Sequence, residues 1–263
     1  MSEILLLNDF VSRGKIAGNM IDPVLSSKNH NVYFLPTALI SHNFSLGNVA
    51  VLDTNTYIQE SLSSWDKLNF KFDVIFIGFI ENNEQKDLII NYIKNLSYDP
   101  LIILDPIMGD DGSIYPGLSD EKIDIYKDLF NIADIILPNH TEAKLLGIDN
   151  FNDYINIDKK FVITSIEEDG SAYTLGISEK LHKVYYEKLD AKYAGTGDLF
   201  DALFINHYLQ NNDFNLSIES TVDQMSKILK IQKSEFEDFD SIFIEAILSR
   251  IDGGFNAWKE ILS

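Results

Sequence analysis

Gly195-Thr196-Gly197-Asp198, followed at once by the apolar run Leu199-Phe200-Asp201-Ala202-Leu203-Phe204, is the most informative stretch of this sequence. Two glycines that flank one residue let backbone N–H groups turn toward an anion without a Cβ clash. The helix that follows adds unpaired N–H groups and the positive end of its dipole. We predict an anion hole here, with Asp198 accepting a proton from a hydroxyl beside a bound phosphoryl group. The alternative is a glycine-rich turn with Asp198 as the helix N-cap, and these four residues alone do not decide between the two.

Upstream of this stretch, short apolar runs of strand length alternate with amphipathic stretches of helix length. Strands separated by helices form βαβ units, so we predict an α/β fold with a mainly parallel sheet covered on both faces. Two further strands lie close together and are expected to form a hairpin or an edge addition. The predicted strands are Ile4–Leu7, Val32–Phe34, Val74–Ile77, Leu101–Leu104, Ile135–Leu137, Phe161–Thr164, Ala172–Leu175 and Val184–Tyr186.

The helical pattern extends through the C-terminal part of the chain. The predicted helices include Asn83–Leu96, Lys122–Phe130, Leu199–Gln210, Ile218–Gln232, Ile242–Ile251 and a short one near Ala257–Leu262. No linker-like or repeated segment interrupts the 263 residues, which contain 6 Pro and 14 Gly. A single domain spanning residues 1–263 is the expectation.

Charge and cysteine content exclude several classes of function. The net charge of −20 repels nucleic acid and anionic lipid, so we expect neither as a partner. With no cysteine, a thiolate nucleophile, a disulfide framework and a Cys-ligated zinc site are excluded. The N-terminus has no signal-peptide pattern and no window has the length of a membrane span, so we expect a cytoplasmic protein.

Unusual residues follow several of the predicted strands. In an open α/β sheet, ligands bind in the crevice outside the carboxyl ends of the strands, so these loops point to one cleft. The residues are Asn8-Asp9, Ser41-His42-Asn43, Gly78-Phe79, Asp105-Pro106 and Asn139 to Glu142. The glycine-rich loop 109–117 that follows Pro106 has the character of a mobile flap or of an ordinary surface loop.

Glu142 has two interpretations. Asn139 as N-cap with Glu142 three residues later makes a capping box. Alternatively, Glu142 converges with Asp105 on a hydrated Mg²⁺ bound to phosphates, since Mg²⁺ needs only one or two carboxylates. Both can hold together. The chain has no P-loop and no protein-kinase signature, so phosphate charge must be offset by a metal ion and backbone amides.

Three segments together resemble the ribokinase-like (PfkB-type) kinases, and within them the pyridoxal kinase branch. They are Asp105-Pro106-Ile107-Met108-Gly109-Asp110, Pro138-Asn139-His140-Thr141-Glu142-Ala143 and Gly195-Thr196-Gly197-Asp198. The resemblance covers about Ile4 to Tyr208. It implies a three-layer α/β/α kinase, homodimeric, that uses ATP, Mg²⁺ and a monovalent cation (K⁺ or Na⁺).

The resemblance also implies roles for individual residues. Asp198 would be the catalytic base, with Gly195 and Gly197 forming the anion hole. Asp105 and Glu142 would serve the metal. Nucleotide contacts would come from Asp105, Asn139, Glu142, Thr164, Ser165 and Thr196, and substrate contacts from Asp9, Ile16, Thr37, Asn43, Phe79 and Tyr193.

The substrate side departs from the family pattern. Asp9 stands where many pyridoxal kinases have a serine, and Leu39 replaces an aromatic residue. The expected activity is phosphorylation of the hydroxymethyl group of a vitamin B6 vitamer: pyridoxal, pyridoxine or pyridoxamine. The alternatives are a hydroxymethylpyrimidine (phosphate) kinase of thiamin synthesis, and a non-catalytic vitamin-binding relative.

Overall fold

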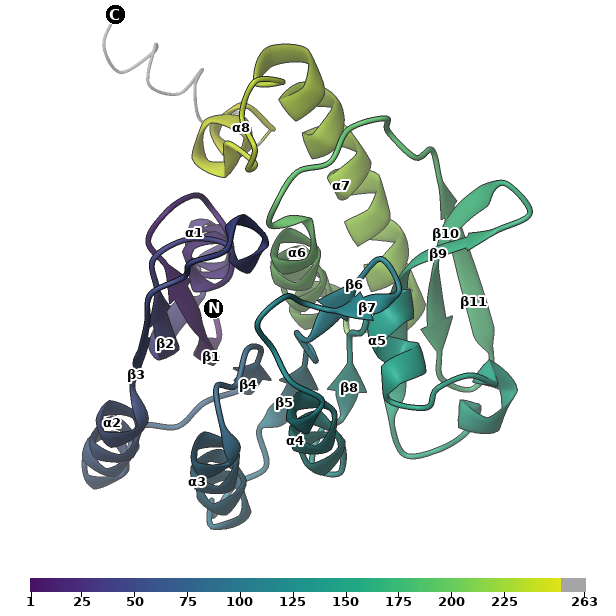
Figure 1. Ribbon diagram of the computed structural model, residues 1–263. Helices are drawn as coiled ribbons and strands as arrows, with labels where there is room; N and C mark the ends of the chain where they lie inside the picture. Colours follow the sequence, from purple (N-terminus) through teal and green to yellow (C-terminus); the bar gives the residue numbers. More distant parts are fainter. Residues whose placement is uncertain (252–263) are drawn as a thin grey trace, which may run out of the picture.

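A nine-stranded sheet organises the computed structural model, which describes residues 1–251 (Figure 1). The strand order is β11-β10-β9-β8-β5-β4-β1-β2-β3. Strands β2, β1, β4, β5, β8 and β9 run parallel, and antiparallel strands extend both edges. The strands are β1 (Glu3–Val11), β2 (Asn31–Ile40), β3 (Val51–Asp53), β4 (Val74–Ile77), β5 (Leu101–Leu104), β8 (Ile135–Ile136), β9 (Lys160–Glu168), β10 (Ser171–Ile177) and β11 (Leu181–Tyr186). The predicted mainly parallel sheet and the hairpin at its edge are confirmed.

Helices cover both faces of the sheet. Because successive strand residues point to opposite faces, Ile4 and Leu6 of β1 enter one core cluster and Leu5 and Leu7 the other. The first cluster packs under α1 (Gly18–Ser27), α6 (Thr196–Asn211), α7 (Phe214–Glu235) and α8 (Ile244–Ile251), and the second under α2 (Asn55–Lys67), α3 (Asn83–Lys94), α4 (Glu121–Phe130) and α5 (His140–Leu145). The three-layer α/β/α arrangement is therefore confirmed. Within the described residues, no helix is both long and apolar enough to cross a bilayer.

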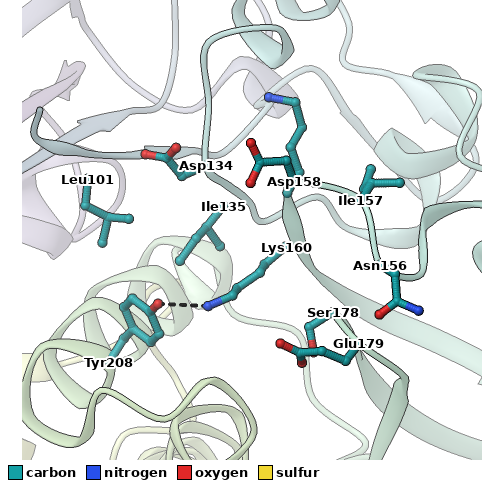
Figure 2. Close-up of a pocket in the computed structure, with 11 residues that line it drawn as sticks. Leu101, Asp134, Ile135, Asn156, Ile157, Asp158, Lys160, Ser178, Glu179 and Tyr208 are labelled. Carbon is teal, nitrogen blue, oxygen red and sulfur yellow. Dashed lines mark hydrogen bonds between the residues drawn. The ribbon is translucent and has the colours of Figure 1, made fainter.

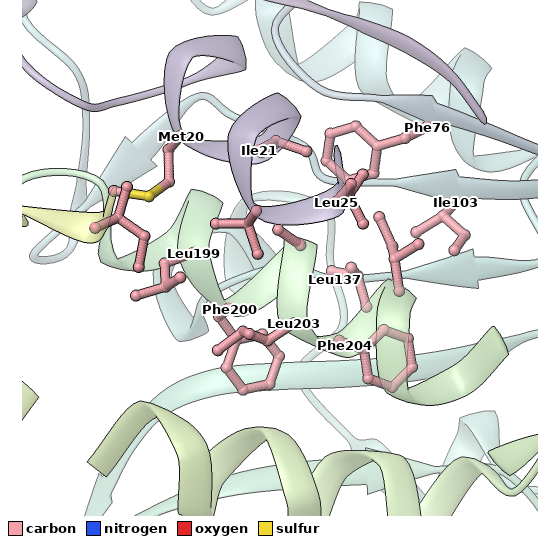
Figure 3. Packing of buried hydrophobic residues seen from close by; sticks show 14 of the residues in the cluster. Met20, Ile21, Leu25, Phe76, Ile103, Leu137, Leu199, Phe200, Leu203 and Phe204 are labelled. Carbon is pink, nitrogen blue, oxygen red and sulfur yellow. The ribbon is translucent and has the colours of Figure 1, made fainter. Parts of the chain in front are cut away.

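Helix α6 is buried on all sides in its middle section, after its first three residues. Every residue from Leu199 to Asn206 is buried, and Leu199, Leu203 and Phe204 pack with Met20, Leu25 and Phe76 (Figure 3). A helix that is apolar all round belongs inside a domain, and α6 contacts both α1 and α7. This packing holds the N-terminus of α6 firmly at the carboxyl edge of the sheet.

The first strand is longer than predicted, which changes the place of Asn8 and Asp9. Pairing of β1 with β4 ends at Leu7, but pairing with β2 continues past a register shift between Asn8 and Phe10. Asn8 and Asp9 therefore lie inside β1, not after it as predicted. They still reach the ligand edge of the sheet, because the neighbouring strand β4 has already ended.

Other elements were not located from the sequence. Helix α1 contains Pro23 in its interior and has no side-chain cap, so it lacks the usual signals of a helix. The 109–117 loop contains a two-stranded hairpin, β6 (Gly109–Asp110) and β7 (Ser113–Ile114). The helix predicted near Ala257–Leu262 lies outside the described residues.

Candidate active site

A cleft of about 630 Å³ opens at the carboxyl ends of the parallel strands. That volume is in the range of small-molecule sites. With one exception, every residue predicted for the site lines it: Asp9, Ile16, Asn43, Phe79, Asp105, Asn139, Glu142, Thr164, Ser165, Tyr193, Gly195, Thr196, Gly197 and Asp198. The exception is Thr37, which is fully buried behind the wall of the cleft and donates its hydroxyl to the Phe79 carbonyl at 2.5 Å.

Gly195 gives α6 its start. It is the N-cap, with a left-handed φ of 87°, and a Cβ at this position would lie 2.4 Å from the Lys15 carbonyl oxygen. Only glycine fits both constraints. Gly197 has no neighbour within 4 Å of a built Cβ, so its backbone faces open space. Asp198 is the third residue of the helix, so the alternative that Asp198 is the N-cap is wrong.

Three aspartates approach one another beside this helix terminus. Burial raises the pKa of Asp105 well above its usual range, and the charges of Asp201 and Asp198 raise it further. Burial likewise raises the pKa of Asp201 and of Asp198. A hydrogen bond from the backbone of Ala17 opposes the rise in the pKa of Asp198 and favours its charged form. This half of the cleft therefore concentrates negative charge that a bound cation would stabilise.

Glu142 is held by backbone amides. Its Oε2 accepts from Asn139 N at 2.9 Å, and its Oε1 accepts from Met108 N at 3.1 Å and from Gly109 N at 3.4 Å. Asn139 caps the helix in return and donates Nδ2 to the Gly109 carbonyl at 2.7 Å. The predicted capping box is confirmed, and it also ties the Asp105–Gly109 loop to the start of α5.

Several buried polar atoms around the cleft lack a hydrogen-bond partner among the described residues. They are Asn8 Nδ2, Asp201 Oδ2 and the hydroxyl of Tyr193. Unpaired buried polar atoms are costly, so they indicate groups that a ligand or ion satisfies. In the part of the chain that the structure describes, no three His, Cys, Asp or Glu side chains are arranged to hold a metal. Asp105 and Glu142 offer one or two carboxylates, a set that suits an ion that keeps most of its water.

The side of the cleft that the resemblance assigns to the nucleotide includes a residue with a left-handed backbone conformation. Ser165 lies in β9 with a left-handed φ of 59°, beside the register shift between β9 and β10. A non-glycine residue in this region costs free energy, and such residues gather at functional sites. Thr164, its neighbour, forms a parallel bridge with Asn139 and so brings β9 against the start of α5.

The opposite side of the cleft is built around Phe79. Its carbonyl accepts from Thr37, its N–H donates to Asn8 Oδ1 at 2.9 Å, and the Lys122 ammonium lies 4.2 Å from its ring centroid. Lys122 is buried and also donates to the carbonyls of Ile80 and Glu81. These contacts fix the ring as a flat wall of the cleft. Burial lowers the pKa of Lys122.

Sequence reasoning did not identify Asp201 or Lys122. Asp201 carries a signal that was available, since it lies three residues after Asp198 and so on the same face of α6. No sequence signal indicates Lys122, because its contact with the Ile80 carbonyl depends on how α4 packs against the end of β4. The sequence left the role of His42 open, and in the structure it lines the cleft. Its Nδ1 lies 2.9 Å from Ser41 Oγ, and its Nε2 lies 2.9 Å from the Gly47 carbonyl oxygen.

A second hollow of about 420 Å³ lies at the opposite edge of the sheet, near the starts of β5, β8 and β9. Lys160 donates to the Tyr208 hydroxyl at 3.1 Å, and Asp134 and Asp158 also line the hollow (Figure 2). None of the predicted motif residues lines it.

A family model described as phosphomethylpyrimidine kinase matches residues 25–237. The chain belongs to this family. The resemblance to ribokinase-like kinases is thereby confirmed, because the matched region includes all three of the motifs that carried it. The matched residues also include the elements of the cleft from β2 to α6.

The chain is similar to a putative pyridoxal kinase of Schizosaccharomyces pombe. The two are 28% identical over 172 residues, and the alignment covers 57% of this chain and 54% of that protein. The chain spans about half to two thirds of the length of the curated relatives it matches. A putative phosphomethylpyrimidine kinase from Bacteroides thetaiotaomicron, crystallised with pyridoxal, has a TM-score of 0.84 and 25% identity, over 95% of this chain and 96% of that one. Pyridoxal kinase from Lactobacillus plantarum has the same fold, with a TM-score of 0.85 and 23% identity over 96% and 99% of the two chains.

Proposed function

We propose that this protein transfers the γ-phosphoryl group of ATP to the hydroxymethyl group of a vitamin B6 vitamer. One observation carries the proposal: a carboxylate, Asp198, lies at the glycine-bounded N-terminus of a buried helix inside a cleft of small-molecule size. A phosphoryl group at that terminus and a hydroxyl beside the carboxylate are the two reactants of a kinase.

The transfer would proceed in line. Asp198 orients the substrate hydroxyl and accepts its proton, and the amides of Gly195 to Asp198 stabilise the charge on the transferring phosphoryl group. The phosphoryl group leaves the β-phosphate of ATP as its bond to the alcohol oxygen forms, giving ADP and a phosphate monoester. When bound, Mg²⁺ would screen phosphate charge from a position near Asp105, with Glu142 acting through water because backbone amides occupy its oxygens. Asn139, Thr164, Ser165 and Thr196 are assigned to the nucleotide.

The ring assignment rests on the relatives. The Bacteroides thetaiotaomicron structure contains pyridoxal, and the Schizosaccharomyces pombe and Lactobacillus plantarum proteins are named as pyridoxal kinases. Phosphorylation of a hydroxymethylpyrimidine is the second candidate, and the description of the matching family favours it. Asp9, Ile16, Asn43, Phe79 and Tyr193 line the half of the cleft assigned to the ring, whereas Thr37 is assigned to the support of Phe79.

The test is ATP consumption with pyridoxal, pyridoxine, pyridoxamine and 4-amino-5-hydroxymethyl-2-methylpyrimidine, each as sole acceptor. We expect turnover with at least one B6 vitamer and a kcat/KM at least tenfold above that for the pyrimidine. The reverse order would establish the second candidate. Tight ring binding with no ATP consumption for every acceptor would establish a non-catalytic relative. A monovalent cation requirement, read by exchanging K⁺, Na⁺ and a bulky organic cation, belongs to the same assay.

The proposal has three further parts. A homodimer rests on the resemblance, whereas a cytoplasmic location and one kinase domain over residues 1–263 rest on the sequence pattern. Light scattering during size-exclusion chromatography reads the first directly, since a dimer has twice the chain mass of 29.9 kDa.

A further inference from the structure

A short segment that precedes α8, residues 240–241, lies against the loop that leads into the Gly195–Asp198 turn. The carbonyl of Asp240 accepts from Ala194 N at 2.9 Å, and Ser241 forms a parallel bridge with Ala194. Ala194 directly precedes Gly195 and lines the cleft. A shift of the 240–241 segment would therefore be passed on to the backbone of the turn.

The same segment contacts the loop after β1, residues 12–17. The Arg13 guanidinium donates to the Asp240 carboxylate at 2.8 Å, and a Cβ built on Gly14 would lie 3.4 Å from Ser241 Oγ. The Lys15 ammonium pairs with the carboxylate of Glu245 in the first turn of α8. Three consecutive residues of this loop thus contact either the 240–241 segment or the helix that follows it.

Loop 12–17 ends in a strained residue that meets the carboxylate of Asp198. Ala17 has a positive φ of 55° although it is not glycine, and a residue in such a conformation persists only where its surroundings fix it. Its backbone N–H is hydrogen bonded to Asp198. The Lys15 carbonyl oxygen would lie 2.4 Å from a Cβ on Gly195, so the two loops also pack tightly against each other.

A buried glutamine fixes the position of the 240–241 segment. Gln232, in α7, is fully buried. Its Nε2 donates to the carbonyls of Phe236 at 2.9 Å and Ser241 at 3.3 Å, and its Oε1 accepts from Phe243 N at 2.8 Å. All three bonds reach main-chain atoms between α7 and α8. Removing a buried amide leaves its partners unpaired, so this turn should loosen when Gln232 is changed.

We propose that the 240–241 segment is a positioning element for Asp198, and that Gln232 is the residue that holds it in place. The segment fixes both the loop that brings Ala17 N–H to Asp198 and the loop that precedes Gly195. This rests on the proposed function, since the alignment of Asp198 affects the rate only if it accepts the proton of the substrate hydroxyl. A small misplacement of a catalytic group lowers the rate strongly while the ligands still bind.

The test changes the support of the segment without changing any residue that lines the cleft. Gln232→Met keeps much of the side-chain volume but removes the three bonds, and Asp240→Arg places a second guanidinium beside Arg13. Arg13→Glu combined with Asp240→Arg reverses the ion pair and serves as the rescue. Asp223→Arg is the matched control, because Asp223 pairs with Lys227 at similar exposure on α7. Each variant is followed by kcat, by KM for ATP and for the acceptor, and by amide hydrogen exchange of the ligand-free protein.

In Gln232→Met we expect kcat to fall about tenfold or more, with both KM values within about threefold of the wild type. Amide exchange in residues 12–17 and 192–198 should become about tenfold faster or more, while that of β5 stays unchanged. Asp240→Arg should lower kcat about two- to fivefold, since a surface ion pair contributes little, and the reversed pair should restore it to within about 1.5-fold. Asp223→Arg should behave as the wild type.

The outcomes separate this inference from the proposed function. If Gln232→Met melts cooperatively and keeps kcat within twofold of the wild type, or if exchange becomes faster throughout the sheet as well, the positioning role is overturned while the kinase activity stands. If Gln232→Met does not fold, the ion-pair variants decide: an unchanged kcat in Asp240→Arg overturns the role, and a loss that the reversed pair repairs supports it. If the wild type phosphorylates no acceptor, the kinase proposal fails. Faster exchange confined to the two loops then still supports the hold of the segment on them, and unchanged exchange overturns it.

Discussion

The two halves of the cleft satisfy their polar groups in different ways. In the half that we assign to phosphoryl transfer, defined by Asp105, Glu142 and Gly195–Asp201, backbone amides hold the carboxylate of Glu142 and the aspartates repel one another. In the half that we assign to the ring, defined by Asp9, Phe79 and Tyr193, burial raises the pKa of Asp9, and the Tyr193 hydroxyl has no hydrogen-bond partner within the described residues. We propose that the first half meets the charge of phosphates and a metal ion, and that the second half meets the ring of the substrate.

Asp198 belongs to both halves. Its charge raises the pKa of Asp9 on one side and of Asp105 and Asp201 on the other. A kinase has to align a ring alcohol with a phosphate chain, so one shared carboxylate between the two compartments is the expected arrangement. The predictions below separate the halves by changing one at a time.

The largest effect is expected from Asp198→Asn. The amide keeps the shape of the side chain but does not accept the hydroxyl proton, so kcat should fall by about 10²–10⁴-fold or more. The melting temperature should not fall, because the change replaces a carboxylate whose charged form is disfavoured by burial. Steady-state kinetics and equilibrium nucleotide binding check this together. A kcat within threefold of the wild type would remove Asp198 from the transfer.

The two glycines of the α6 terminus form the second comparison. Gly195→Ala adds a Cβ 2.4 Å from a backbone oxygen at a positive φ, so it should destabilise the fold by about 2 kcal/mol or more. Gly197→Ala meets no protein atom, and alanine favours a helix by about 1 kcal/mol, so the melting temperature should hold or rise. If an ATP phosphate binds close to the Gly197 backbone, the added methyl group should raise the apparent KM for ATP severalfold.

Thermal melting and ATP kinetics of both variants distinguish fold from function at this turn. A Gly197→Ala variant with wild-type ATP kinetics would show that the phosphates pass elsewhere, and the anion hole would then have to lie nearer Gly195.

The transfer half could be predicted from sequence, and the ring half only in part. Gly195–Asp198 and Asn139–Glu142 are short, local patterns in which turn geometry and helix capping leave few other residue types possible. Asn139–Glu142 reaches the cleft because it follows the parallel strand β8. Gly195–Asp198 follows the antiparallel strand β11 through a loop, so sheet topology alone does not place it there. Chemistry and local structure therefore agree there.

Contacts between distant elements determine the ring half instead. Thr37 was predicted to meet the substrate, yet its hydroxyl bonds the Phe79 carbonyl 42 residues away. Lys122 reaches that region from α4, and no local pattern indicates where its ammonium ends. Likewise, Asp9 was expected after a strand, whereas a register shift inside β1 turns it toward the cleft. Such features depend on packing over long sequence separations, which periodicity does not encode.

A smaller effect is expected from Lys122→Met. Methionine keeps much of the side-chain volume but removes the ammonium beside Phe79 and leaves the carbonyls of Ile80 and Glu81 without their donor. The KM for the ring substrate should rise about 5- to 30-fold, as losing one or two kcal/mol of positioning implies, while kcat changes less than threefold.

Lys160→Met is the matched control for this change. Lys160 also contacts aromatic rings, those of Tyr208 and Phe214, but at the second hollow. Its kinetics should stay within twofold of the wild type. Equal losses of activity in the two lysine variants would mean that Lys122 acts only through general stability.

The smallest effect concerns stability and pH at Asp9. Burial, and then the charge of Asp198, raise the pKa of Asp9 from 3.8 to about 8. A carboxyl whose pKa is higher in the folded state stabilises the fold fully below about pH 3.8, and this contribution is lost as pH rises through 8. Asp9→Asn, which never ionises, should therefore melt above the wild type at pH 8.5, by about 2–4 °C for each kcal/mol regained. The difference in melting temperature between Asp9→Asn and the wild type should narrow at pH 5.5, where the wild-type carboxyl is mostly protonated when folded.

Melting curves of the ligand-free protein at the two pH values, with Asp134→Asn as the control, measure that difference directly. A gap that widens toward acid pH would mean that Asp9 is charged and paired in the folded protein.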